Sequence, residues 1–144
     1  MIEGASRGRL GAAMTVLALV GLGLAGYLLA VRLFGGVPVC GPVHGCDTVA
    51  SSEYATVLGL PVALFGVGFS LVLSTASFAW WRRADRRALY AAYGLGLAGI
   101  IAAAYLTYLE LFVIEAICIY CVSYAVTIVA GWILAVLALR SAPA

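Results

Sequence analysis

Four long apolar runs dominate this sequence and restrict the folds that it can adopt. The first contains Arg32 as its only charged residue and exceeds the roughly 20 residues needed to cross a hydrocarbon core. The whole chain is 65% hydrophobic and only 10% charged, whereas a soluble domain carries about 25% charged residues. We therefore expect an all-α integral membrane protein, a single domain (1–144) whose four transmembrane helices form a bundle and span residues 10–34, 57–81, 89–109 and 117–139.

A cleaved signal peptide is the alternative for the first run, because Arg7 and Arg9 precede it. The apolar core of a signal peptide covers only about 7–15 residues and ends at a small-residue cleavage site. We therefore expect the first run to be retained as a span.

One long polar loop is expected between the first two spans, over residues 35–56. Asp47 can satisfy the open amides of a helix's first turn, which predicts a short helix from Thr48 to Tyr54. Pro61 is expected early in the second span, where its missing amide costs least.

The arginines predict an orientation, because loops on the cytoplasmic side of a membrane retain basic residues. In a four-span arrangement every arginine except Arg32 falls on one side. We therefore expect an inner-membrane protein with both termini in the cytoplasm, and with the 35–56 loop and all four cysteines on the oxidising, periplasmic side. The net charge of only +2 bears on this orientation and indicates no nucleic-acid partner, whereas the apolar spans predict contact with membrane lipid.

Small residues recur four positions apart in the spans, a spacing that lets helix backbones approach closely in lipid. Small residues are also simply common in this chain, so part of the pattern is expected by chance. The pairs are Gly21 and Ala25, Gly66 and Ser70, Gly94 and Ala98, and Gly99 and Ala103.

Cys118 and Cys121 form a C-x-x-C at the start of the fourth span, and Cys40 and Cys46 lie in the loop. The two sulfurs of a helical C-x-x-C lie on one face, and the unpaired amides of the first turn favour the thiolate. Four cysteines allow three pairings, and proximity in the sequence suggests one bond within each motif. Two such pairs on one side of a membrane predict a relay that exchanges disulfides by thiolate attack.

Two other hypotheses use the same thiols. A zinc site made by all four cysteines also favours C-x-x-C spacing, and would make the chain a four-span metal-binding or metal-transport protein. An outward-facing thiol cluster tends to oxidise, however, so we expect no metal. The bond between Cys40 and Cys46 could also be purely structural.

An apolar slot is predicted below the C-x-x-C. At about 100° per residue, the thiols share a helix face with Ala125, Ile128 and Trp132. A membrane-soluble quinone is the ligand expected in such a slot.

Two acids precede the C-x-x-C, Glu110 and Glu115. Negative charges beside a thiol oppose thiolate formation. We therefore expect both side chains at the membrane surface, with a proton-accepting role for either as the alternative.

The cysteine motifs and their flanks resemble the vitamin K epoxide reductase family in its bacterial form. The resemblance lies in the five-residue spacing between Cys40 and Cys46, in the segment CDTVASSEYATVLGLPVALFG, and in CIYC opening the last helix. It covers nearly the whole chain. The order of the motifs is informative, because the other bacterial quinone-linked disulfide generator carries its C-x-x-C in the first outer loop.

This resemblance implies a four-helix bundle around a quinone of the ubiquinone or menaquinone type. It also implies roles for the cysteines: Cys40 meets the partner protein, Cys46 forms the transient bridge to Cys118, and Cys121 lies against the quinone ring. Ser52 matches the family's loop serine near that ring.

The chain departs from the family pattern at the quinone. The vertebrate enzymes hold the vitamin K carbonyls with an Asn on the second helix and a Tyr on the fourth, and this chain contains no Asn. Tyr124 lies one residue out of register with the family Tyr. Many bacterial relatives also carry a fused thioredoxin-like domain. Because this chain ends at Ala144, its expected partner is a separate thioredoxin-like dithiol protein outside the cytoplasm, from which electrons pass to the quinone as disulfides are made.

Overall fold

The computed structural model describes residues 2–36, 48–49 and 52–141. Four long helices make up most of these residues: α1 (Ile2–Leu33), α3 (Val62–Arg83), α4 (Arg86–Tyr108) and α5 (Ile119–Ser141). All four are long and apolar enough to cross a membrane. The predicted all-α membrane bundle is therefore confirmed.

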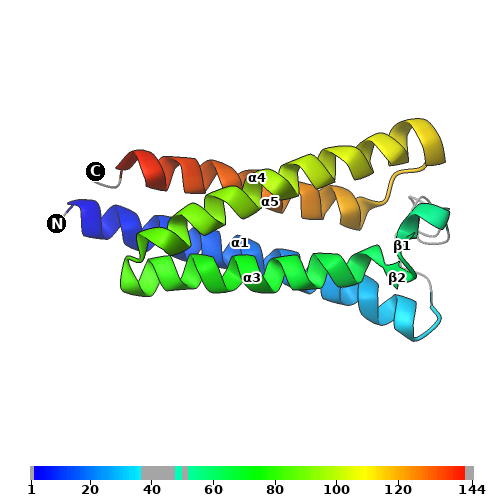
Figure 1. Ribbon diagram of the computed structural model, residues 1–144, viewed down its shortest axis with the longest axis horizontal. Helices are drawn as coiled ribbons and strands as arrows, with labels where there is room; N and C mark the ends of the chain where they lie inside the picture. The colour runs from blue at the N-terminus through cyan, green and yellow to red at the C-terminus, as the bar shows by residue number, and fades with distance from the viewer. Residues whose placement is uncertain (1, 37–47, 50–51, 142–144) are drawn as a thin grey trace.

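The two ends of the bundle differ in what they carry (Figure 1). The ends of the chain and the tight turn between α3 and α4 lie together at one end. At the other end lie the strands β1 (Thr56–Val57) and β2 (Leu60–Pro61) and the connection into α5 that contains Cys118. The C-x-x-C and the loop before α3 therefore share the end of the bundle that faces away from the termini.

The second span begins later than the sequence predicted, because residues 56–61 form an antiparallel hairpin. Leu58 and Gly59 both adopt positive φ, 55° and 81°, as the two-residue turns that match the twist of a hairpin require. Pro61 then has an extended conformation and is the residue before the first turn of α3, not a residue inside that turn. In the preceding loop, Thr48 and Val49 are helical and η1 (Glu53–Ala55) is a short 3₁₀ turn. The predicted cap, Asp47, lies outside the described residues.

The tight turn between α3 and α4 is fixed by local capping. Ala84 adopts the left-handed conformation with φ of 54°, and its amide donates to the Trp80 carbonyl at 2.9 Å. Asp85 then caps α4, because its carboxylate accepts a hydrogen bond from the Arg87 amide at 3.0 Å. Such a cap satisfies one of the open donors of the helix.

A cluster of buried apolar residues lies toward the end of the bundle that carries the termini. Its members come from all four helices and are Met14, Trp80, Leu89, Ala92, Ala135 and Ala138. By contrast, many large apolar side chains along the helices are exposed, such as Leu19, Ile101 and Val126. An apolar exterior is expected for helices that contact lipid, where the hydrophobic effect does not drive helix packing.

Small residues let two of the helix pairs approach closely, α1 with α3 and α3 with α4. A Cβ added to Gly66 on α3 would lie 3.3 Å from the Cβ of Ala25 on α1, and one added to Gly99 on α4 would lie 2.7 Å from the Phe69 ring on α3. A Cβ added to Gly94, however, would meet nothing within 4 Å. The small-residue spacing therefore marks packed positions at some of the predicted sites and not at others.

Gly11 provides the sharpest stability prediction, because a Cβ there would lie 2.6 Å from the Cβ and 3.0 Å from the Cα of Trp81. The backbone of α1 or α3 must move to admit it. We expect Gly11→Ala to destabilise the protein by about 1–3 kcal/mol, the usual cost of overpacking. The measurement is the thermal unfolding midpoint of the purified protein in detergent. Gly23→Ala is the matched control, since a Cβ at Gly23 meets nothing within 4 Å. Equal midpoints for the two variants would contradict this packing.

Candidate active site

The C-x-x-C opens α5, as the sequence predicted. The carbonyl of Cys118 accepts the first helical hydrogen bond, from the Val122 amide at 3.0 Å, so Cys118 occupies the capping position. Cys118 is 2% exposed, and Cys121 is partly buried one turn further along. Both are free thiols in this structure.

The Cys121 thiol and the start of the helix together favour the thiolate form of Cys118, and the Cys121 thiol contributes most. A hydrogen bond from the Cys121 side chain is the largest cause that lowers the pKa of Cys118, to about 7, and the backbone amides of Cys121 and Tyr120 add to it. Burial and the charge of Glu110 act in the opposite direction. A substantial fraction of Cys118 is therefore thiolate at neutral pH, the form that exchanges disulfides.

Glu110 lies inside the site, and the interfacial position predicted for it is wrong. The α4 helix widens at its end into a π-helical turn, η2 (Leu109–Ile114), and Glu115 closes that turn with a left-handed conformation. The Ala116 amide then donates to the Glu110 carbonyl at 3.0 Å. The chain reverses over the Glu110 side chain, which is only 4% exposed, whereas Glu115 is exposed as predicted.

The reversal brings the Glu110 carboxylate to the C-x-x-C. Its Oε2 accepts a hydrogen bond from the Cys118 amide at 3.3 Å, and the carboxylate also forms a hydrogen bond with the Cys121 thiol. A helix-start amide and a thiol proton thus satisfy an acid that is otherwise costly to bury.

An aromatic pair holds the start of α5 against α1. The rings of Tyr27 and Tyr120 are 5.1 Å apart between centroids and inclined at 43°. Because Tyr120 lies between the two cysteines in the sequence, this contact fixes the position of the C-x-x-C relative to the end of α1.

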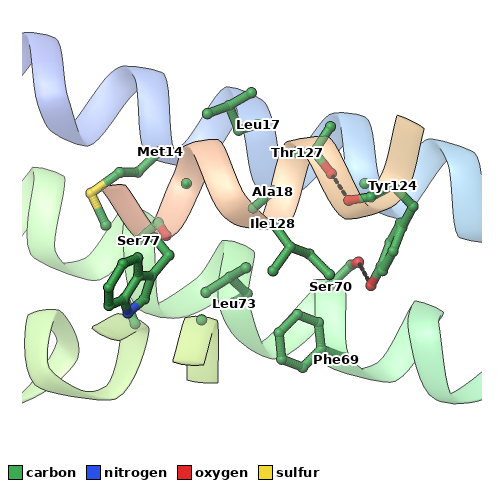
Figure 2. A pocket seen from close by; sticks show the side chains of 15 residues that line it. Met14, Leu17, Ala18, Phe69, Ser70, Leu73, Ser77, Tyr124, Thr127 and Ile128 are labelled. Carbon is green, nitrogen blue, oxygen red and sulfur yellow. Dashed lines mark hydrogen bonds between the residues drawn. The ribbon is translucent and has the colours of Figure 1, made fainter. Parts of the chain in front are cut away.

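Tyr124 points into the bundle and connects α5 to α3. Its hydroxyl donates to the Gly66 carbonyl at 3.0 Å and is 2.8 Å from the Ser70 hydroxyl, which must then be the donor of that second bond. Figure 2 shows the Tyr124 and Ser70 side chains meeting between the helices. Both hydroxyls are therefore already engaged within the protein.

The structure separates two residues that the sequence assigned to one slot. Ile128 faces the interior, where it lines a cavity of about 20 Å³ together with Ser70 and Tyr124 (Figure 2). A cavity of that size holds about one water molecule and is too small for a quinone ring. Ala125 instead faces an outer groove between α4, η2 and α5.

The outer groove has the size of a small-molecule site, about 430 Å³ against a usual range of roughly 300–1,000 Å³. Its walls are mostly apolar, with Thr107 and Tyr108 as polar exceptions, and Ala125 and Val129 supply the α5 side. Ala125 lies four residues after Cys121 and thus on the same side of α5. The groove therefore begins about one helical turn below the Cys121 thiol and opens on the surface that contacts lipid.

The remaining predicted site residues come from the loop. The Ser52 hydroxyl donates to the Val49 carbonyl at 2.7 Å, so it is engaged in a local turn. Cys40 and Cys46 lie outside the described residues. Within the part of the chain that the structure describes, no group of three or more metal-ligating side chains occurs.

Comparison with known protein families agrees with this geometry. The model of the vitamin K epoxide reductase family matches residues 12–136, which include all four cysteines and the four spans apart from their outermost residues. The chain belongs to the vitamin K epoxide reductase family. The comparison with curated proteins found no match. Family membership makes the chain a membrane thiol oxidoreductase, in a family that is associated with quinones.

Sequence reasoning expected Glu110 at the membrane surface and gave it a proton-accepting role only as the alternative, so it did not place this acid beside the thiols of this vitamin K epoxide reductase family member. The signal was an acid within the apolar run that ends α4, eight residues before Cys118. An ionisable residue within a span is by default a functional hypothesis. The reversal of the chain after the π-helical turn, which the sequence did not predict, is what brings this acid to the thiols.

Proposed function

We propose that this protein is a quinone-reducing thiol oxidoreductase that makes disulfide bonds outside the cytoplasm. Electrons enter from a separate thioredoxin-like dithiol protein at Cys40 and Cys46, pass to Cys118 and Cys121, and leave to a quinone of the ubiquinone or menaquinone type. The catalytic residues are these four cysteines.

The observation that carries this proposal is the setting of the C-x-x-C. The exchanging sulfur, Cys118, has its pKa lowered to about 7, chiefly by a hydrogen bond from the Cys121 thiol. Cys121 itself lies about one turn above a lipid-facing groove. A thiolate suits exchange with a protein disulfide, and an apolar groove open to lipid suits a lipid-soluble oxidant. The site thus joins the two kinds of substrate that the proposal requires.

The groove beside Ala125 fits a quinone ring better than the interior of the bundle does. The interior cavity is only about 20 Å³ and is lined by Tyr124 and Ser70. The Tyr124 hydroxyl is already bonded to the Ser70 hydroxyl and to the Gly66 carbonyl. In the groove, Thr107 and Tyr108 are the residues that could donate hydrogen bonds to a quinone carbonyl. When bound, the quinone supplies a two-electron acceptor.

The proposed location is the inner membrane, with both termini in the cytoplasm. Arginines cluster at the end of the bundle that carries the termini, in the turn between α3 and α4 and at Arg140 near the end of α5. Basic residues favour the cytoplasmic side. The C-x-x-C, at the opposite end of the bundle, then faces the oxidising side, where disulfides persist.

The test is reduction of a short-tailed soluble quinone by the protein purified in detergent, with a small dithiol as the electron source. We expect the unsubstituted protein to reduce both ubiquinone-type and menaquinone-type analogues, monitored by their ultraviolet absorbance. Replacing Cys118 and Cys121 together with Ala should reduce the rate to that of dithiol and quinone alone. Mass spectrometry of the purified protein identifies the quinone that accompanies it. Absence of quinone reduction, together with stoichiometric bound zinc in elemental analysis, would overturn the proposal.

A further inference from the structure

Glu110 is a buried carboxylate in direct contact with the reacting thiols, and the relay as proposed above gives it no role. It is 4% exposed at the end of a membrane-spanning helix, where an ionisable group is costly unless it is used. Its two contacts are the Cys118 amide at 3.3 Å and the Cys121 thiol. The first contact positions the carboxylate, and the second gives it access to a proton.

The Cys121 thiol has one proton and two neighbouring acceptors. These acceptors are the Cys118 sulfur and the Glu110 carboxylate. Formation of a bond between the two sulfurs requires that both lose their protons, so Cys118 cannot be the final acceptor of the Cys121 proton. Of the two, only the Glu110 carboxylate can keep that proton while the disulfide forms.

We propose that Glu110 is the catalytic proton acceptor for Cys121. In this step the bond between sulfur and hydrogen breaks at Cys121 and a bond between oxygen and hydrogen forms on the Glu110 carboxylate. Cys121 becomes a thiolate, Glu110 becomes a neutral acid, and neither is oxidised. The two electrons leave the pair only when the disulfide forms, and under the proposed function, on which this inference rests, a quinone receives them.

The other polar groups near the pair are less suited to this role. Glu115 is exposed at the end of the π-helical turn. Tyr120 and Tyr27 contact each other through their rings, and a neutral phenol carries no negative charge with which to hold a proton taken from a thiol. The carboxylate is therefore the group whose basicity and position both suit transfer from a thiol.

The test uses diamide, a small two-electron oxidant of dithiols, on the full chain with Cys40 and Cys46 replaced by Ala. Oxidation then has two steps: diamide first bonds to the Cys118 thiolate, and Cys121 then attacks that sulfur and releases the reduced diamide. The rate of the first step, addition of diamide to Cys118, rises with diamide concentration. The second step, attack by Cys121, takes place within the protein, so its rate does not depend on diamide concentration and is called the limiting rate below. Stopped samples analysed by mass spectrometry separate the two steps.

We expect the first step in Glu110→Gln to be no slower, because the Glu110 charge no longer opposes the Cys118 thiolate. The limiting rate should fall about a hundredfold, the usual contribution of a general base. Raising the pH should restore that rate in Glu110→Gln, because hydroxide can then remove the Cys121 proton. Glu115→Gln is the matched control and should change neither step. Glu110→Asp keeps a carboxylate on a shorter side chain and should give a limiting rate between those of the unsubstituted protein and Glu110→Gln. It replaces Glu110→Gln as the test variant if the latter does not fold.

Two results would overturn the proposal. An equal or higher limiting rate in Glu110→Gln would mean that the carboxylate acts only as a nearby negative charge. A parallel loss of both steps that high pH does not restore would mean that Glu110 is structural. The diamide assay contains neither quinone nor partner protein, so it tests Glu110 separately from the proposed function. If Glu110→Gln slows the second step as expected but the unsubstituted protein reduces no quinone, the proposed function is rejected and the role of Glu110 stands.

Discussion

The Cys121→Ser protein should accumulate a disulfide between Cys46 and Cys118 and should reduce no quinone. In the unsubstituted protein, attack by a Cys46 thiolate on a bond between Cys118 and Cys121 would join Cys46 to Cys118 and release Cys121 as the leaving thiolate. In the Cys121→Ser protein the same bridge forms when the Cys118 thiolate attacks an oxidised Cys40–Cys46 bond at Cys46 and releases Cys40 as the leaving thiolate. The structure favours Cys118 as the exchanging sulfur, because the Cys121 thiol and, to a lesser degree, the backbone amides of the first turn of α5 lower its pKa to about 7. Without Cys121, no thiol of the pair remains to resolve the bridge.

The measurement for this prediction is peptide mapping of the non-reduced protein by mass spectrometry. Cys118→Ser is the matched control, because it should prevent the crosslink while also abolishing quinone reduction. If Cys118 in the Cys121→Ser protein is instead joined to Cys40, or stays free under oxidising conditions, the proposed electron path is wrong even though the family assignment stands.

The helices could be predicted from the sequence because lipid imposes a length and an apolar composition on each span. The residues at which these helices begin and end depend instead on local capping and turn conformations, which lipid does not impose. The α1 helix starts at Ile2, well before the apolar run, because hydropathy marks the part of a helix that lies in lipid and not the whole helix. The α3 helix starts after the hairpin, whose turn places Leu58 in a left-handed conformation that its side chain disfavours.

The C-x-x-C and its place at the start of α5 were predictable, because the motif itself identifies both thiols. The surroundings of these thiols were not. Ala125 and Ile128 are only about 60° apart around a helix, and the packing of α4 against α5 decides which of them faces the groove and which faces the interior. A helical projection of one span contains no information on where its neighbours lie.

The Glu110 contact illustrates the same limit for a polar residue. The sequence gives the separation between Glu110 and Cys118, but a regular helix through both would carry the thiol away from the acid by about 1.5 Å per residue. The π-helical turn and the left-handed Glu115 instead fold the chain back on itself. Glutamate has no preference for that conformation, so the reversal left no clear signal in the sequence.

Replacing Cys40 with Ala should abolish oxidation of the thioredoxin-like partner yet leave quinone reduction by a small permeant dithiol intact. The partner protein is too large to reach Cys118, which is 2% exposed beneath the reversal of the chain, and so depends on the loop pair to exchange disulfides. A small dithiol can attack the C-x-x-C directly, so that the second half of the relay continues without the first.

Both activities are measured on one preparation, with partner oxidation followed by alkylation and gel shift and quinone reduction followed by absorbance. Cys118→Ala is the comparison variant, because it should lose both activities whichever reductant is supplied. If Cys40→Ala also loses both, the bond between Cys40 and Cys46 is structural and the loop does not carry electrons. If Cys40→Ala retains both activities, the partner reaches the C-x-x-C without the loop pair. Cys118 must then become exposed when the partner binds.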